Sequence, residues 1–213
     1  MKQLYFLLAI FAPFVVIAQK NYEPEKIIWE GNTYPYRYHH MEQYFNYYPD
    51  KRPVPNKDTT IINRNYVAVF EMKERKFYLN DILIKGRNSA EKKLSVYKEL
   101  SRKGDPMFLT WITGLFDIGI GKENFTKTDS ITPIYEQYIV FEIKKGTLGR
   151  TEYFTYNQLK LFKDYQYKRF KETLDYQRLY RRLRYNGMSE SEVSSHVYEF
   201  ILFYSKFNFL KKN

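Results

Sequence analysis

One short pattern occurs twice in this chain, and it constrains the fold more than any other feature. Val69–Lys73 and Val140–Lys144 lie 71 residues apart and differ only in having Met or Ile at the fourth place. Each copy is rich in β-branched and aromatic residues and leads through a polar turn into a second apolar segment. The pattern predicts two β-hairpins, over 66–84 and 138–148. An internal duplication of a β-unit and two independent amphipathic hairpins would both produce this match.

The C-terminal part of the chain is predicted to be helical. Residues 157–185 contain neither Gly nor Pro, and their apolar side chains recur at helical steps. Asn186 and Gly187 are a helix stop signal, and Ser189 with Glu192 has the sequence of a capping box that opens a second helix. These signals predict a helical hairpin, which either packs on the sheet or protrudes from it.

Shorter patterns complete the expected fold. They predict a strand over 27–29, a helix over 38–48, a helix over 89–102, and two strands or a strand with a bend over 107–120. The fold class is therefore α+β, an antiparallel sheet from two similar β-hairpin units plus a C-terminal helical hairpin. The expected domains are a signal peptide at 1–18, a β-rich domain with short helices at 19–156, and a basic helical hairpin at 157–213.

The N-terminus has the layout of a secretory signal peptide. Lys2 precedes an apolar run over residues 4–17, and Ala18 ends it as a small residue at the cleavage position. The run is shorter than the roughly 20 residues that a bilayer-spanning helix needs, and Pro13 interrupts it. We expect cleavage after Ala18 and a periplasmic or extracellular location, with a retained membrane anchor as the alternative. No Cys follows the run, which excludes a lipoprotein anchor.

Composition narrows how this fold is stabilised. The chain has no cysteine, so an oxidising compartment would give it no disulfides. It has 22 Tyr and 17 Phe but two Trp. Because Tyr joins an apolar ring to a hydroxyl that can stay hydrated, a Tyr-rich surface suits the binding of glycans, peptides or proteins. A biased genomic base composition is the alternative explanation.

The net charge of +11 is concentrated in one segment. Residues 158–185 hold nine basic and three acidic side chains, a surplus of six. A basic face on an exported protein favours an acidic protein, an anionic lipid or an acidic glycan as partner, and we expect no nucleic acid. A solvated helix face without a partner is the alternative. The candidate binding residues are Lys168, Arg169, Arg178, Arg181, Arg182 and Arg184.

No motif in the sequence indicates a metal, a cofactor or a nucleophile. His39 and His40 are adjacent, and adjacent helical side chains point about 100° apart, so they chelate one ion poorly. The chain lacks Cys and any Gly-x-Ser-x-Gly sequence. Gly119 and Gly121 lack the third glycine of a dinucleotide loop and are interpreted as a bend. We therefore expect no metal and no cofactor.

Three glutamates are the candidates for acid–base chemistry. Glu71 and Glu142 hold the same place in the two hairpins, so they could face each other across a pseudo-two-fold axis. Glycoside hydrolysis uses two carboxylates about 5–10 Å apart, and Glu136 is a third candidate. Two solvent-facing strand positions are the alternative interpretation.

Three segments together resemble a pattern in an uncharacterised family of small bacterial proteins. They are Trp111–Gly114, Ile134–Glu136 and Phe141–Gly146. In that family a Trp-x-Thr-Gly strand precedes a Tyr-Glu element and a hairpin. The resemblance covers roughly residues 27–150, implies the two-hairpin fold and carries no known activity.

The sequence thus favours an exported, non-enzymatic binding or interaction protein that uses a Tyr-rich surface and a basic helical face. A small cell-envelope hydrolase with paired carboxylates is one alternative. An immunity or inhibitor protein against an envelope-acting toxin is another.

Overall fold

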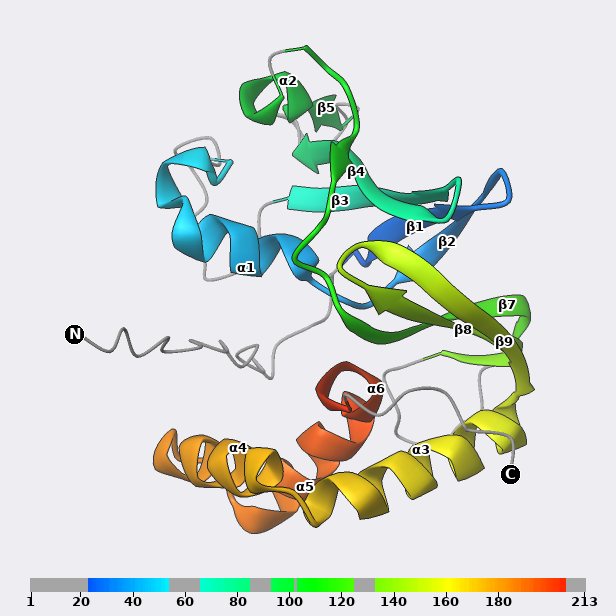
Figure 1. The fold of residues 1–213 in the computed structure, drawn as a ribbon, viewed down its shortest axis with the longest axis vertical. Helices are drawn as coiled ribbons and strands as arrows, with labels where there is room; N and C mark the ends of the chain where they lie inside the picture. The colour runs from blue at the N-terminus through cyan, green and yellow to red at the C-terminus, as the bar shows by residue number, and fades with distance from the viewer. Residues whose placement is uncertain (1–22, 54–65, 85–92, 102, 125–132, 206–213) are drawn as a thin grey trace, which may run out of the picture.

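The computed structural model describes residues 23–53, 66–84, 93–101, 103–124 and 133–205, which form an α+β fold (Figure 1). Its strands are β1 (Glu25–Trp29), β2 (Asn32–Tyr36), β3 (Tyr66–Lys73), β4 (Lys76–Ile84), β5 (Leu94–Ser95), β6 (Met107–Phe108), β7 (Gly114–Asn124), β8 (Ile134–Lys144) and β9 (Thr147–Thr155). Its helices are α1 (His40–Tyr47), the short 3-10 helix η1 (Pro49–Lys51), α2 (Tyr97–Leu100), α3 (Tyr156–Lys171), α4 (Leu174–Tyr185), α5 (Glu190–Glu199) and α6 (Ile201–Tyr204). The predicted signal peptide lies outside the described residues.

The strands form one mostly antiparallel sheet in the order β2-β1-β3-β4-β9-β8-β7, with β5 and β6 also paired to β4. The pair of β1 and β3 is parallel. β4 and β9 pair at one position, Lys76 opposite Thr147. The sheet therefore divides into two halves, β2-β1-β3-β4 and β9-β8-β7, which lie above and below each other in Figure 1.

Both predicted hairpins are confirmed, and they share one type of turn. The first turn is Glu74 and Arg75, with φ of 49° and 60°, and the second is Lys145 and Gly146, with φ of 50° and 75°. Two central residues with positive φ define the type I′ turn, whose twist matches that of the flanking strands. Three of these four residues are not glycine, so the strand pairing on either side holds them in the left-handed region.

The hairpins also share their register. With the 71-residue offset, Tyr66 opposite Ile84 in the first corresponds to Gln137 opposite Thr155 in the second. Each hairpin contains one register shift, with a single extra residue in its second strand, after which the two registers agree again. The two shifts fall at different places, since Phe70 lies opposite Leu79 whereas the equivalent Phe141 lies opposite Thr151. The internal duplication stays a prediction.

The two turns meet across a local two-fold axis. Phe77 N donates to Gly146 O at 2.8 Å, and Leu148 N donates to Arg75 O at 2.8 Å. The offset of 71 residues turns the first of these hydrogen bonds into the second. The hairpins therefore pair with each other through equivalent residues, and the rest of the fold is built around this contact.

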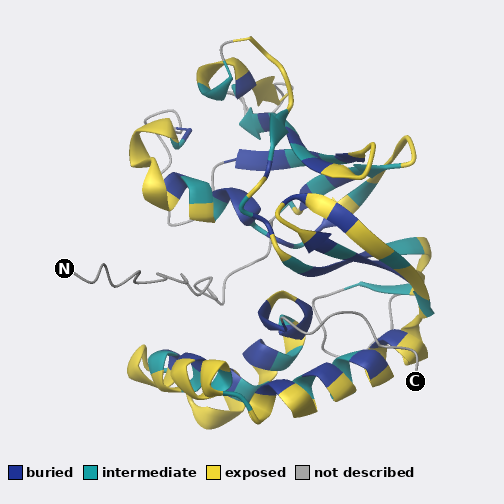
Figure 2. Ribbon diagram, in the orientation of Figure 1, coloured by how far each residue is buried: buried dark blue, intermediate teal, exposed yellow. Residues whose placement is uncertain are grey.

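Two hydrophobic cores lie on the two sides of β8, because its side chains alternate between faces. Ile139, Phe141 and Ile143 belong to the first core, which fills the space between the two half-sheets. Tyr138 and Val140 belong to the second core, which the helices cover. Figure 2 shows the buried residues of α3 and α6 on the side that faces the sheet.

The C-terminal helices both cover the sheet and extend beyond it. α3 contacts β8 and β9, and α6 contacts β7, whereas α4 contacts α3 and α5 and extends away from the strands (Figure 1). The prediction of one helix over 157–185 is wrong, because the helix is interrupted between the end of α3 at Lys171 and the start of α4 at Leu174. Thr173 leaves the helical conformation there, and its hydroxyl accepts a hydrogen bond from Tyr176 N at 3.2 Å. The predicted capping box of Ser189 and Glu192 is confirmed at α5.

The predicted helix over 89–102 is also wrong in its described part. Leu94 and Ser95 form β5, which pairs with the end of β4, and only Tyr97–Leu100 is helical. Strand pairing at the edge of β4 overrides the helical spacing of this segment. The expected strand over 27–29, the helix over 38–48 and the two strands of 107–120 are confirmed. No helix in the described ranges is long and apolar enough to cross a bilayer.

Candidate functional site

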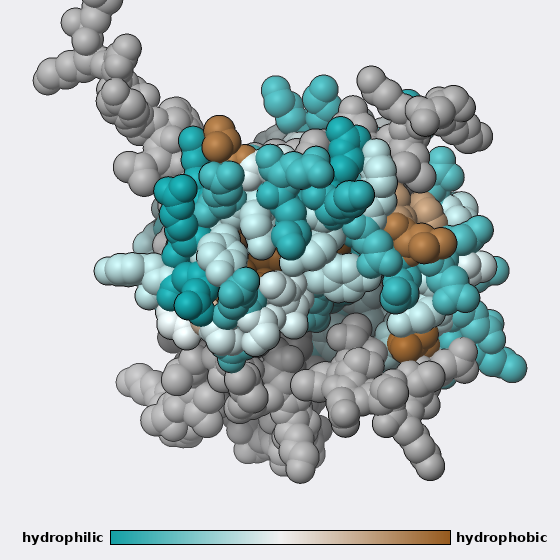
Figure 3. Space-filling model, turned by 90° about the horizontal axis from the view of Figure 1, so that it is seen from below, coloured by the Kyte–Doolittle hydropathy of each residue, from teal (hydrophilic) through white to brown (hydrophobic). Residues whose placement is uncertain are grey.

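The candidate basic residues lie on the helices that extend from the sheet. Lys168 and Arg169 are in the last turn of α3, and the other four are on α4: Arg178, Arg181, Arg182 and Arg184. We call these six residues the basic arm. Leu179 and Leu183 turn toward the second core. The arginines at 178, 181 and 184 are exposed, whereas Arg182 is half-buried. Figure 3 views the helices from below, and the described part of that face is mostly hydrophilic.

The arm includes an exposed ion pair. Arg178 Nη1 lies 3.8 Å from the Asp175 carboxylate, and both side chains are exposed. Exposed pairs of this kind contribute about 0–1 kcal/mol. Arg169 donates to the Tyr165 hydroxyl at 3.0 Å, and Arg184 donates to Met188 O at 2.8 Å. Both of these acceptors are uncharged.

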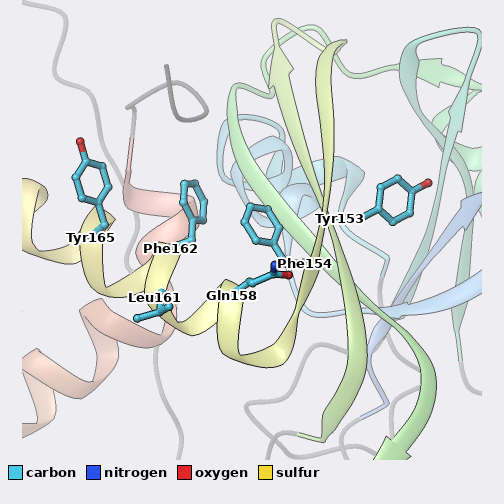
Figure 4. Close-up of a pocket in the computed structure, with 6 residues that line it drawn as sticks. All are labelled: Tyr153, Phe154, Gln158, Leu161, Phe162 and Tyr165. Carbon is cyan, nitrogen blue, oxygen red and sulfur yellow. The ribbon is translucent and has the colours of Figure 1, made fainter. Parts of the chain in front are cut away.

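A groove lies where the end of β9 meets the start of α3 (Figure 4). Its volume is about 400 Å³, and its lining is mainly aromatic: Tyr153, Phe154, Gln158, Leu161, Phe162 and Tyr165. Phe154 and Phe162 stack against each other at 5.3 Å and form its floor. Leu161 and Tyr165 are 69% and 44% exposed, although both are large and partly apolar. The groove therefore presents an apolar surface to solvent beside the basic arm.

The groove meets β9 near the C-terminal end of the strand, at Tyr153 and Phe154. Tyr153 and Phe154 are consecutive in a strand, so their side chains point to opposite faces of the sheet, as Figure 4 shows. A groove lined by residues of both faces lies at an edge or an end of the sheet, and β9 ends at Thr155, directly before α3. One edge of β9 is paired with β8.

Part of the tyrosine content is structural. The buried tyrosines are Tyr36, Tyr38, Tyr66, Tyr97, Tyr138 and Tyr204. Most of them have a hydrogen-bonded hydroxyl, such as that of Tyr66, which donates to Glu42 at 2.6 Å. The exposed aromatic surface is provided by a different set: Tyr47, Tyr48, Tyr153, Tyr156, Tyr165 and Tyr185. Of these, Tyr153 and Tyr165 lie in the groove.

A polar cluster that was not predicted from the sequence connects the two half-sheets and the helices. Arg37 Nη2 donates to the buried Asp117 carboxylate at 2.7 Å, and the Tyr38 hydroxyl donates to the same oxygen. Lys163 of α3 adds a charge from the helical side. One signal was present: Asp117 is the single charged residue in an apolar strand segment. Nothing in the sequence indicated its partner, which lies 80 residues away.

Electrostatics in this cluster favour a structural role. Burial alone would raise the pKa of Asp117, but the Arg37 guanidinium and the Tyr38 hydroxyl together hold that pKa below its usual value. Burial lowers the pKa of Lys163 to about 8, and the nearby Arg37 charge adds to this shift. Asp117 therefore stays ionised and fully engaged, and it is not available as an acid or a base near neutral pH.

The adjacent histidines point to different partners. His40 Nε2 lies 2.7 Å from the Tyr36 hydroxyl, and its ring is surrounded by aromatic side chains of the first core. Burial lowers the pKa of His40 to about 3, so the ring is neutral. His39 Nδ1 instead lies 3.3 Å from the buried Glu25 carboxylate. Among the described residues, no group of three or more His, Cys, Asp or Glu is placed to hold a metal ion.

The candidate glutamates do not converge. Phe70 and Phe141 point into the first core. Glu71 and Glu142 are the next residues in their strands, so both point away from the first core, on the outer face of their own half-sheet. Glu71 accepts a hydrogen bond from Asn80 at 2.6 Å. Glu136 is exposed on β8. This arrangement gives no pair of facing carboxylates.

The Trp-x-Thr-Gly segment supports the second hairpin. Ile112 O accepts from Gly146 N at 2.8 Å, and Thr113 Oγ1 accepts from Lys145 N at 2.9 Å. Both residues of the second turn are therefore held by this segment. In the described structure this segment holds the second turn in place.

Comparison with known proteins adds no further identification. No protein-family model, no curated protein and no solved structure matches this chain.

Proposed function

We propose that this chain is an exported, non-enzymatic binding protein that holds an acidic protein partner on its basic arm. The observation that carries this proposal is the positive surplus on α3 and α4, where Arg169, Arg178, Arg181 and Arg184 are exposed. Such a surface attracts an acidic partner over a distance of about 8–10 Å at moderate ionic strength. It also excludes basic partners by repulsion.

The arm fits a protein better than a membrane surface. A helix that lies in a bilayer interface presents one apolar face to the acyl chains. On α4, Leu179 and Leu183 are 6% and 2% exposed, because they pack in the second core. Leu174 and Tyr185 are exposed, but they stand at the two ends of α4 with the exposed Arg178 and Arg181 between them, so α4 has no continuous exposed apolar face. The charged faces remain available to an acidic protein surface, and the aromatic groove beside them offers apolar contact. An inhibitor of an envelope-acting toxin would be one form of such a binding protein.

Export is the second part of the proposal, and it is supported by the leader of the sequence. Fractionation of cells that produce the full chain, followed by N-terminal sequencing, tests it directly. We expect the protein outside the cytoplasm with Gln19 as its first residue. A cytoplasmic protein that retains Met1 would contradict export.

Salt-dependent binding tests the arm. The probe is poly-L-glutamate, compared with phosphatidylglycerol vesicles and with polygalacturonate. We expect binding of the polypeptide that weakens steeply as salt is raised. Arg178→Gln combined with Arg181→Gln should weaken it about tenfold, which corresponds to about 1.4 kcal/mol.

A matched control removes the same charge elsewhere. Lys73→Gln combined with Lys144→Gln changes two exposed residues at the ends of β3 and β8. This variant should bind as the unmodified protein does. Binding that is insensitive to salt, equal weakening in both variants, or a preference for vesicles or the glycan would contradict the proposal.

The hydrolase is not proposed. It would need two carboxylates that face each other, whereas Glu71 and Glu142 both point away from the first core, which lies between their half-sheets.

A further inference from the structure

Equivalent strands of the two hairpins have different neighbours on their outer edges. β4 is flanked on that edge by β5, where Leu83 and Ile84 pair with Ser95 and Leu94, and by β6. The equivalent strand is β9, and the 71-residue offset places Phe154 and Thr155 where β4 has Leu83 and Ile84. Beyond Thr147, β9 pairs with no described strand on this edge.

In the first hairpin, the outer edge of β4 accepts an added strand. Ile82 O accepts a hydrogen bond from Val96 N at 2.9 Å, so the backbone of Ile82 points outward to the added segment. Tyr153 is the equivalent residue in β9, and together with Phe154 it lines the groove. An outward-pointing backbone group of an edge strand is a ready partner for another strand.

The side chains around this edge define the chemistry of an occupant. Leu161 and Tyr165 lie one helical turn apart on α3, and Lys168 and Arg169 follow on the same face one turn later. The surface therefore changes from apolar to basic along α3. Glu152, exposed on β9, disfavours an acidic side chain directly beside the strand.

We propose that the outer edge of β9 receives an extended segment of the acidic partner as an added antiparallel strand. Its apolar side chains fill the groove, and acidic residues at its N-terminal end reach Lys168 and Arg169. The direction follows from β5, whose N-terminal residue lies opposite the last residue of β4. This inference rests on the proposed function and names the part of the partner that binds. Strand addition of this kind takes affinity from backbone hydrogen bonds and specificity from side-chain pockets.

Labelled peptides test this inference. The probes are fluorescein-labelled nine-residue peptides in which Leu alternates with Ser and two Glu residues stand at the N-terminal end, or at the C-terminal end for comparison. We expect the first set to bind more tightly. Methylation of alternate backbone nitrogens in one register should weaken binding about tenfold, and methylation in the other register should leave it unchanged, because only alternate groups face β9.

Two protein variants provide the matched pair. Leu161→Glu places a charge in the groove and should weaken peptide binding about tenfold. Leu94→Glu changes another exposed leucine, 52% against 69%, which lies on β5 outside both the groove and the basic arm, and this variant should bind as before. Amide hydrogen exchange adds an independent measurement, in which the Tyr153 N–H should become protected when peptide is bound.

Each other outcome overturns the inference. Equal binding to both leucine variants, equal effects of methylation in both registers, or no peptide binding would show that the edge is not used. A dimer that Leu161→Glu dissociates would show that a second copy of this chain covers the groove. If the arm variant Arg178→Gln/Arg181→Gln loses binding but Leu161→Glu does not, the proposed function stands and strand addition fails. If the unmodified protein shows no salt-dependent binding of poly-L-glutamate, the proposed function fails.

Discussion

The two hairpins share a turn, a register and a position of equivalent contact, yet they have different surroundings. Val69 and Val140 are equivalent, but Val69 is half-buried on an outer face and Val140 is fully buried beneath the helices. The third strand also differs, since β1 runs parallel to β3 whereas β7 runs antiparallel to β8. The hairpin is therefore the unit that occurs twice in this fold, and the elements that pack around it distinguish the two hairpins.

The comparison also locates the surface that is available for binding. On the first hairpin, β5 and β6 cover the outer edge of the second strand. On the second hairpin the corresponding edge borders the groove and the start of α3. The chain thus completes one copy with its own segments, and we infer that a partner completes the other.

The largest expected effect tests whether both hairpins contribute equally to the first core. Phe70 and Phe141 are equivalent and both are fully buried in that core. Phe70→Ala and Phe141→Ala should each lower the free energy of unfolding by about 3–5 kcal/mol. Urea denaturation measures both. A difference of more than about 2 kcal/mol between them would show that the two copies do not share the core evenly.

Substitutions in the two turns should have different effects on stability, although the two turns have the same backbone conformation. A Cβ at Gly146 would lie 2.7 Å from Leu109 O, and its φ is positive, so Gly146→Ala should cost about 2–3 kcal/mol. The equivalent residue is Arg75, whose guanidinium donates to Leu148 O and Gly149 O. Arg75→Gly removes those hydrogen bonds but relieves a positive φ, so its cost should stay below about 1 kcal/mol. Equal costs in urea denaturation would contradict this difference.

The outer faces should differ next. Val140→Ala leaves a cavity beneath α3 and α6 and should cost about 2 kcal/mol. Val69→Ala changes the equivalent half-buried residue and should cost less than 1 kcal/mol, about as much as one partly buried methyl pair contributes. Thermal unfolding of the two variants, compared with the unmodified protein, checks the order. The reverse order would mean that the helices do not cover β8 tightly.

The sequence predicted the hairpins because their signals are local. The β-branched and aromatic residues of 66–72 and 138–143 and the short polar turns specify strand pairing without reference to the rest of the chain. The capping box at Ser189 is local in the same sense. The break at Thr173 was missed because a single cap without Gly or Pro is a weak signal inside a long helical pattern.

Long-range features could not be predicted in the same way. β5 forms because the edge of β4 offers backbone partners to Leu94 and Ser95, whose own spacing is helical. The contact of Arg37 with Asp117 joins residues 80 positions apart, and their sequence contexts do not refer to each other. The basic residues of the candidate site were found from composition, but the groove beside them depends on how β9 meets α3.

The smallest expected effect compares the two cores, each of which buries one histidine against a tyrosine. His40 Nε2 lies 2.7 Å from the Tyr36 hydroxyl in the first core, and His196 Nε2 lies 2.9 Å from the Tyr204 hydroxyl in the second. Burial lowers the pKa of both rings, to about 3 for His40. The unfolded chain therefore binds protons near pH 6.5 that the folded chain does not, and stability falls as the pH drops below that value.

Two double variants separate these contributions. His40→Leu with Tyr36→Phe removes the first pair, and His196→Leu with Tyr204→Phe removes the second, without leaving a buried polar group unpaired. Between pH 6.5 and 5.5 the first variant should lose about 1 kcal/mol less stability than the unmodified protein. The second should change the slope in the same direction. Urea denaturation at the two pH values measures both slopes, and an unchanged slope for the first variant would mean that His40 is protonated in the folded core.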